Sequence, residues 1–142
     1  MNNFDERQLW IRGNIFRNMF WILAALIMVN ACLARLDIVW ADAFYSNTII
    51  FFTAIAAGSI EMIFREVYFK NPKQQWFFVL FGIGGLFLFV MNIIHLAKGD
   101  EFISNGALTD TGGSFIYGML IFSIGIGGAI KIFMNKIRKN EE

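Results

Sequence analysis

Four long apolar runs without a single Lys, Arg, Asp or Glu constrain the fold of this chain more than any other feature. They are residues 18–34, 43–60, 74–97 and 111–130, with lengths of 17, 18, 24 and 20 residues. A bilayer core is about 30 Å thick, and an α-helix crosses it with roughly 20 apolar residues. All four runs are long enough once flanking Lys and Arg side chains reach toward the headgroups. Only 16% of the residues are charged, which is too few to cover a soluble domain of this size.

We therefore predict an all-α, integral membrane four-helix bundle, formed by a single membrane domain over residues 1–142. The expected spans are about 16–36, 43–64, 75–97 and 113–134, joined by outer loops at about 37–42 and 98–112 and by an inner link at about 65–74. The first run is not expected to be a cleavable signal peptide. Two acidic residues, Asp5 and Glu6, precede it, and no small-x-small cleavage site follows it.

The distribution of basic residues predicts the orientation. Ten of the 12 Lys and Arg residues fall in three regions that would share one side of the membrane. They are Arg7, Arg12, Arg17, Arg65, Lys70, Lys73, Lys131, Lys136, Arg138 and Lys139. The opposite side holds only Arg35 and Lys98, beside five acidic residues. Because segments rich in Lys and Arg stay in the cytoplasm, we expect both termini to be cytoplasmic in a multi-pass protein of the cell membrane.

The tetrapeptide Gly-Ile-Gly-Gly occurs twice, at residues 82–85 and 125–128, inside the third and fourth runs. A phosphate-binding glycine loop needs exposed backbone amides, which are costly in hydrocarbon, so nucleotide binding is not expected. Small residues instead let two helices approach closely. The predicted packing residues are Gly58, Gly82, Gly85, Gly118 and Gly125, with Ser114 and Ala129 on the same stripe as the last two. We expect the two copies to touch at similar depth, or with an offset of about five residues if Lys131 rather than Lys136 marks the membrane boundary.

Glu61 is the most notable polar residue, because a carboxylate inside a span costs about 2.5–3.5 kcal/mol on insertion scales and often marks a proton or cation path. Arg65 lies four residues further on, at the spacing of a structural ion pair. Both interpretations stay open.

Asn92 and His95 are further candidate polar or binding residues near the outer end of the third span. With the outer acidic residues, His95 is a candidate for a metal or proton site, although no His or Glu stands at metal-ligand spacing from it. We expect Asn92 and Asn30 to form interhelical hydrogen bonds. With one His and one Cys in the chain, we expect no catalytic residue, no metal and no cofactor, and hence no enzyme.

The N-terminal segment "FDERQLWIRGNIFRNMFWIL" contains an Asp-Glu-Arg-Gln box, followed by Ile11, Arg12, Gly13 and an apolar span. It resembles the start of small bacterial multi-span membrane protein families of uncharacterised function, which have an N-terminal D-E-R-Q/E box. The resemblance implies a three- or four-span bundle of a bacterial inner membrane, often encoded beside a helix-turn-helix regulator. Asp5, Glu6 and Arg7 are then candidate contacts for a partner, and the alternative is a helix cap.

From these features we expect a non-catalytic accessory or regulatory membrane protein that acts through helix packing and cytoplasmic-segment contacts. Two alternatives are a small proton- or cation-coupled transporter that uses Glu61, and a membrane immunity protein. The expected partners are the lipid bilayer and either a protein or a second copy of the chain. Nucleic acid is not expected.

Overall fold

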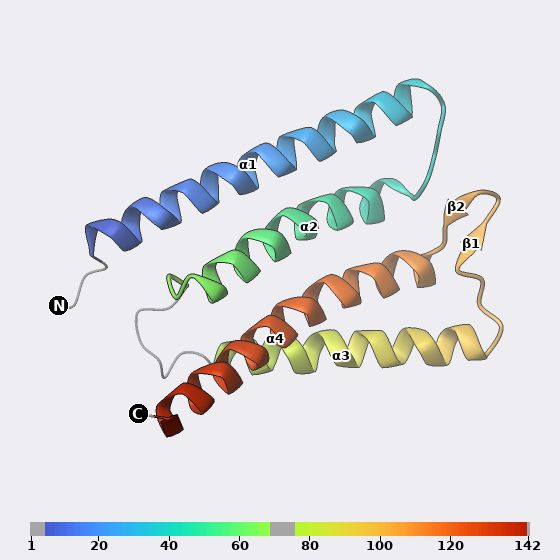
Figure 1. Cartoon of the computed structure of the whole chain (residues 1–142). Coiled ribbons are helices and arrows are strands. Elements are labelled where there is room, and N and C mark those ends of the chain that lie inside the picture. Colours follow the sequence, from blue (N-terminus) through green and yellow to red (C-terminus); the bar gives the residue numbers. More distant parts are fainter. Residues whose placement is uncertain (1–4, 69–75, 142) are drawn as a thin grey trace.

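The computed structural model describes residues 5–68 and 76–141 and consists of four long helices (Figure 1). They are α1 (Glu6–Arg35), α2 (Ala43–Phe64), α3 (Trp76–Ala97) and α4 (Asp110–Glu141), with strands β1 (Ile103–Ser104) and β2 (Ala107–Leu108) between the last two helices. Each helix is long and apolar enough to cross a membrane. The predicted all-α four-helix bundle is confirmed, and the helices support a multi-pass membrane protein.

The helices pack in the order α1, α2, α4, α3, with extensive contacts only between neighbours in this order. The chain runs up and down, so the starts of α1 and α3 and the ends of α2 and α4 share one end of the bundle (Figure 1). We call it the basic end. Its described basic residues are Arg7, Arg12, Arg17, Arg65, Lys131, Lys136 and Arg138. We call the opposite end, which carries β1 and β2, the hairpin end.

Helix α1 begins ten residues before the predicted first span, because Asp5 caps it. The Asp5 carboxylate accepts a hydrogen bond from the Gln8 backbone N–H at 2.6 Å, and the Gln8 side-chain oxygen accepts one from the Asp5 N–H at 3.3 Å. This reciprocal capping box satisfies two N–H groups that would otherwise be unpaired.

Helix α4 also exceeds its predicted span at both ends. With 30 and 32 residues, α1 and α4 are about 45 and 48 Å long at 1.5 Å per residue, longer than a bilayer core of about 30 Å.

Helix α2 ends in a Schellman motif that buries the next apolar residue. Glu66 has a φ of 60°, its N–H donates to the Ile63 carbonyl at 3.2 Å, and the Val67 N–H donates to the Met62 carbonyl at 3.0 Å. Val67 is only 1% exposed and packs with Met62 and with Ile15 of α1. The motif therefore fixes the end of α2 against α1.

A short hairpin lies at the hairpin end, where the sequence predicted only an outer loop at about 98–112. β1 and β2 pair antiparallel, and the connecting Asn105 and Gly106 have φ values of 51° and 82°. Positive φ at both turn positions is typical of the type I′ turns that Asn-Gly prefers, so the dipeptide was the missed signal. The Leu108 N–H donates to the Trp40 carbonyl at 2.8 Å, which ties the hairpin to the α1–α2 connection.

The predicted inner link at 65–74 is described only as far as Tyr68. Its remainder, including Pro72, lies outside the described residues.

Candidate functional site

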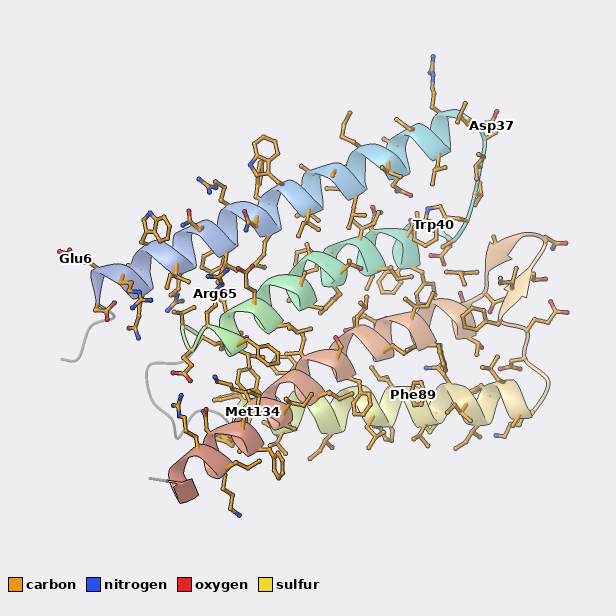
Figure 2. All side chains as sticks on the ribbon, viewed as in Figure 1. Glu6, Asp37, Trp40, Arg65, Phe89 and Met134 are labelled. Atoms are coloured by element: carbon orange, nitrogen blue, oxygen red, sulfur yellow. The ribbon has the colours of Figure 1, made fainter. Side chains whose placement is uncertain are left out.

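The α3–α4 contact is built on glycines. Gly82 lies directly against Gly125, where a Cβ added to Gly125 would come within 2.5 Å of the Gly82 backbone nitrogen. A Cβ on Gly85 would come within 2.6 Å of the Phe122 Cα atom. Gly118 packs against Leu88 and the Phe89 backbone. The Phe89 ring, labelled in Figure 2, stacks on Phe122. The absence of side chains at these positions lets the two backbones approach closely and increases their dispersion contacts.

The two Gly-Ile-Gly-Gly copies meet at their first glycines, Gly82 and Gly125, and extend from there in opposite directions along the helices. They are therefore offset rather than level. The offset is about three residues, because Gly85 faces Phe122 and Gly128 faces Phe78. It lies between the level arrangement and the offset of about five residues that the sequence left open. Within each copy the glycines differ, because Gly84 has nothing within 4 Å of an added Cβ and Gly127 has only an ordinary contact with Ile60 at 3.6 Å.

Gly58 and Gly128 also pack against neighbouring helices, whereas the predicted stripe residue Ala129 is exposed. Gly58 of α2 packs against the Met19 side chain of α1, and Gly128 packs against the Phe78 side chain of α3. Ala129 was expected on the α3-facing stripe and is exposed instead. Phe78 packs on Gly128 at this level, so the contact surface of α4 has shifted by one residue.

A polar contact joins α3 to α4 nearer the hairpin end. The Ser114 hydroxyl donates to the Asn92 side-chain oxygen at 2.6 Å, and the Asn92 amide nitrogen donates to the Leu88 carbonyl at 2.7 Å. Asn92 is only 7% exposed, so these bonds satisfy a buried amide. The predicted interhelical hydrogen bond of Asn30 is not formed. Its side-chain oxygen instead accepts a hydrogen bond from the Trp40 indole N–H at 2.7 Å, and Trp40 lies in the α1–α2 connection rather than in another helix.

Asn92→Ala should lower the free energy of unfolding by about 0.6–2 kcal/mol, the range measured for interhelical hydrogen bonds in membranes. Ser114→Ala in the Asn92→Ala background should lower the free energy of unfolding little further, because the hydrogen bond between the two side chains is already absent. Unfolding by denaturing detergent measures both. Asn47→Ala is the matched control, since the Asn47 amide bonds only to the Ala43 carbonyl of its own helix at 2.7 Å. An equal loss from Asn47→Ala would contradict the prediction.

His95 forms a local side-chain contact at the hairpin end. Its Nδ1 lies 3.0 Å from the Asp100 carboxylate, which also accepts a hydrogen bond from the Thr111 hydroxyl at 3.4 Å. The Asp42 carboxylate is used at the N-terminus of α2, where it accepts from the Tyr45 N–H at 2.7 Å. Among the described residues, no three His, Cys, Asp or Glu side chains gather as a metal site. The geometry is that of a satisfied surface network.

Two ion pairs lie at the basic end. Glu61 contacts Arg65 at 2.8 Å within α2, one turn before the helix ends, and its side chain is 34% exposed. Glu66 contacts Lys131 at 2.8 Å and thereby joins α2 to α4. The hydrogen bond from Lys131 lowers the pKa of Glu66, and the charges of Lys131 and Arg138 add to this effect. Sequence reasoning missed this second pair, because nothing local links residues so far apart in the chain.

Acidification should weaken the α2–α4 contact through Glu66. Its carboxyl pKa is lower in the folded than in the unfolded chain, so the ion pair contributes stability above the ordinary pKa of 4.5. That contribution is lost as the pH falls through the lowered pKa. Lys131→Gln should therefore destabilise the protein near neutral pH and reduce the loss of stability on acidification, measured as thermal midpoints from pH 6 down to about 3. Lys98→Gln, at the hairpin end, is the control and should lose as much thermal stability on acidification as the wild type. If Lys131→Gln also lost as much as the wild type, the role assigned to the Glu66–Lys131 ion pair would be contradicted.

The Asp-Glu-Arg-Gln box has one structural role and leaves two charged side chains at the surface. Asp5 and Gln8 form the capping box, whereas Glu6 and Arg7 are exposed. The next residues, Leu9 and Trp10, are 55% and 70% exposed. Ile11 and Ile15 are the first residues of α1 in the apolar cluster that packs against Met62 and Val67 at the end of α2. We call residues 6–10 the α1 extension.

Helix α4 likewise continues beyond Lys131 toward its end at Glu141, and Phe133, Met134 and Ile137 are exposed there. Met134 is labelled on this part of α4 in Figure 2. Its Lys136 and Arg138 are exposed as well. Both terminal helices therefore reach the basic end with apolar and basic side chains that no described element covers.

The geometry defines a multi-pass membrane bundle with a glycine-based contact between α3 and α4 and with helical extensions at one end. The chain matches no protein-family model, no curated protein and no solved structure. The function is therefore inferred from the described residues alone.

Proposed function

We propose that the chain is a non-catalytic membrane accessory or regulatory protein whose α1 extension binds a protein partner at the cytoplasmic side. The α1 extension carries the proposal. It is helical from Glu6, it precedes the α1 residues Ile11 and Ile15 that pack at the end of α2, and it presents Trp10 at 70% exposure. Exposed Trp beside Arg is typical of the residues that contribute most to protein–protein binding. The helix cap at Asp5 presents these side chains from a rigid element rather than from a loose terminus.

The contacts of the polar candidates support a structural rather than a chemical role. Glu61 pairs with Arg65, Asn92 bonds to Ser114, and His95 pairs with Asp100. Groups in these arrangements hold helices and connections in place, and a catalytic acid or base would instead need to face a substrate site. The glycine contact between α3 and α4 provides the rigid body from which the extensions project.

A photocrosslinking amino acid at Trp10 tests the proposal in cells. We expect capture of one cytoplasmic protein, with the same protein captured from Leu9. The charge reversal Arg7→Glu should abolish capture without changing the amount of membrane-inserted protein. Val29 is the matched control, because it is 57% exposed on the same helix but lies within the apolar segment. Capture of lipid alone from both Trp10 and Val29 would reject the proposal.

A further inference from the structure

The surface of α3 contains an apolar groove of about 460 Å³ on the side that α4 leaves open. It is lined by Phe77, Leu80, Phe81, Gly84 and Leu88 of α3 and by Ile121 of α4. Gly84 makes the groove possible, since a Cβ at this position would meet nothing within 4 Å. Its volume falls within the range of about 300–1,000 Å³ that small-molecule sites occupy.

The length and position of the groove match one leaflet of a bilayer. It starts at Phe77, the second residue of α3 at the basic end, and stops at Leu88, halfway along a helix that continues to Ala97. At 1.5 Å per residue, that distance is about 16 Å, and half of a bilayer core is about 15 Å. A transmembrane helix of a partner would follow α3 along its whole length. The hydrocarbon chain of a lipid begins at the headgroups and ends at the bilayer midplane, so it needs only the half of α3 along which the groove runs.

The basic end supplies the features that fit an anionic headgroup. Trp76 stacks on Phe77 with ring centroids 4.6 Å apart, and it is 55% exposed, as expected of an aromatic residue at the membrane–water interface. Phe78 packs on Gly128, so the residues of α4 that follow Lys131 lie beyond the start of α3. Lys136 and Arg138 are exposed there, and basic residues beside a membrane attract anionic lipids.

From these observations we propose that the groove binds one acyl chain of an anionic phospholipid from the leaflet at the basic end, with Lys136 and Arg138 near its headgroup. The site is independent of the proposed partner contact of α1, because α1 has no extensive contact with α3 or α4. It would be an individual lipid site, distinct from the bilayer that surrounds the other helix faces.

Native mass spectrometry of the full chain, released from micelles doped with phosphatidylglycerol and phosphatidylcholine, tests this site. The wild type should retain one phosphatidylglycerol in preference to phosphatidylcholine. Gly84→Leu fills the groove and should reduce that retention at least several-fold. Gly13→Leu is the matched control, because Gly13 is also a helical glycine with nothing within 4 Å of an added Cβ, and it should retain the lipid.

Circular dichroism and thermal unfolding establish that each variant is folded. Ile121→Phe narrows the groove from α4 and should give the same loss, which keeps the test decisive if Gly84→Leu does not fold. Lys136→Gln combined with Arg138→Gln should keep lipid retention but abolish the preference for phosphatidylglycerol. Three results would overturn the site: undiminished lipid retention in the folded groove variants, no lipid on the wild type, or a dimer in place of a lipid adduct. An unchanged preference in the double variant would overturn the assigned headgroup contact.

Discussion

Gly85→Leu should disrupt the packing of α3 on α4, whereas Gly84→Leu, at the neighbouring residue, should leave the fold intact. A side chain at Gly85 points at the Phe122 backbone, which cannot move without displacing α4. A side chain at Gly84 enters the open groove. Overpacking costs about 1–3 kcal/mol even for small additions in a tight core, so leucine should cost more than that at Gly85.

Unfolding in a denaturing detergent, followed by circular dichroism, measures this difference. The comparison is well matched, since both glycines lie in the same turn of the same helix and receive the same residue. Gly106 would be a poorer control despite its exposure, because its φ of 82° makes any side chain there strained. Equal tolerance of leucine at Gly84 and Gly85 would mean that α3 and α4 do not meet at this face.

Gly125→Ala should destabilise the bundle by about 1–3 kcal/mol, while Gly82→Ala, on the other side of the same contact, should be tolerated. The two glycines touch, but their missing Cβ atoms point differently. A Cβ on Gly125 is directed into the Gly82 backbone, whereas a Cβ on Gly82 lies 3.5 Å from the Gly125 Cα atom, an ordinary contact. Alanine also favours a helix over glycine by about 1 kcal/mol, which should offset small losses at Gly82.

The same detergent titration tests this asymmetry, and Gly127→Ala serves as the control on α4, because its Cβ would have only ordinary contacts. A double variant of Gly82 and Gly125 should be no better than Gly125→Ala alone, since the collision is with backbone atoms. Equal destabilisation by Gly82→Ala and Gly125→Ala would show that the helices cross at another angle.

These results bear on function because the α3–α4 contact forms the proposed lipid site. The groove exists only while α4 holds Ile121 beside α3. The basic end depends on the Glu66–Lys131 pair and on the end of α2, where Val67 packs against α1. Variants that loosen the glycine contact should therefore weaken lipid retention as well, whereas Gly84→Leu should remove the lipid from an intact bundle.

The sequence by itself determined the number of helices and their approximate centres. Span length and charge-free composition are local properties, because each helix satisfies its own backbone hydrogen bonds in the membrane. The Asn-Gly hairpin and the Asp5 capping box were also readable, since turn and cap chemistry depends on adjacent residues. The sequence likewise selected Gly82 and Gly85 as packing residues and Asn92 as a partner in an interhelical hydrogen bond.

Only the tertiary structure decided how the helices combine. It set the packing order α1, α2, α4, α3. It also set the offset of the two Gly-Ile-Gly-Gly motifs and determined which glycines of each motif pack against the neighbouring helix. It also brought Glu66 to Lys131 and left Ala129 exposed. These features depend on the crossing angle and register of helices far apart in the chain, and periodicity specifies only the face that a residue occupies, not what lies opposite that face.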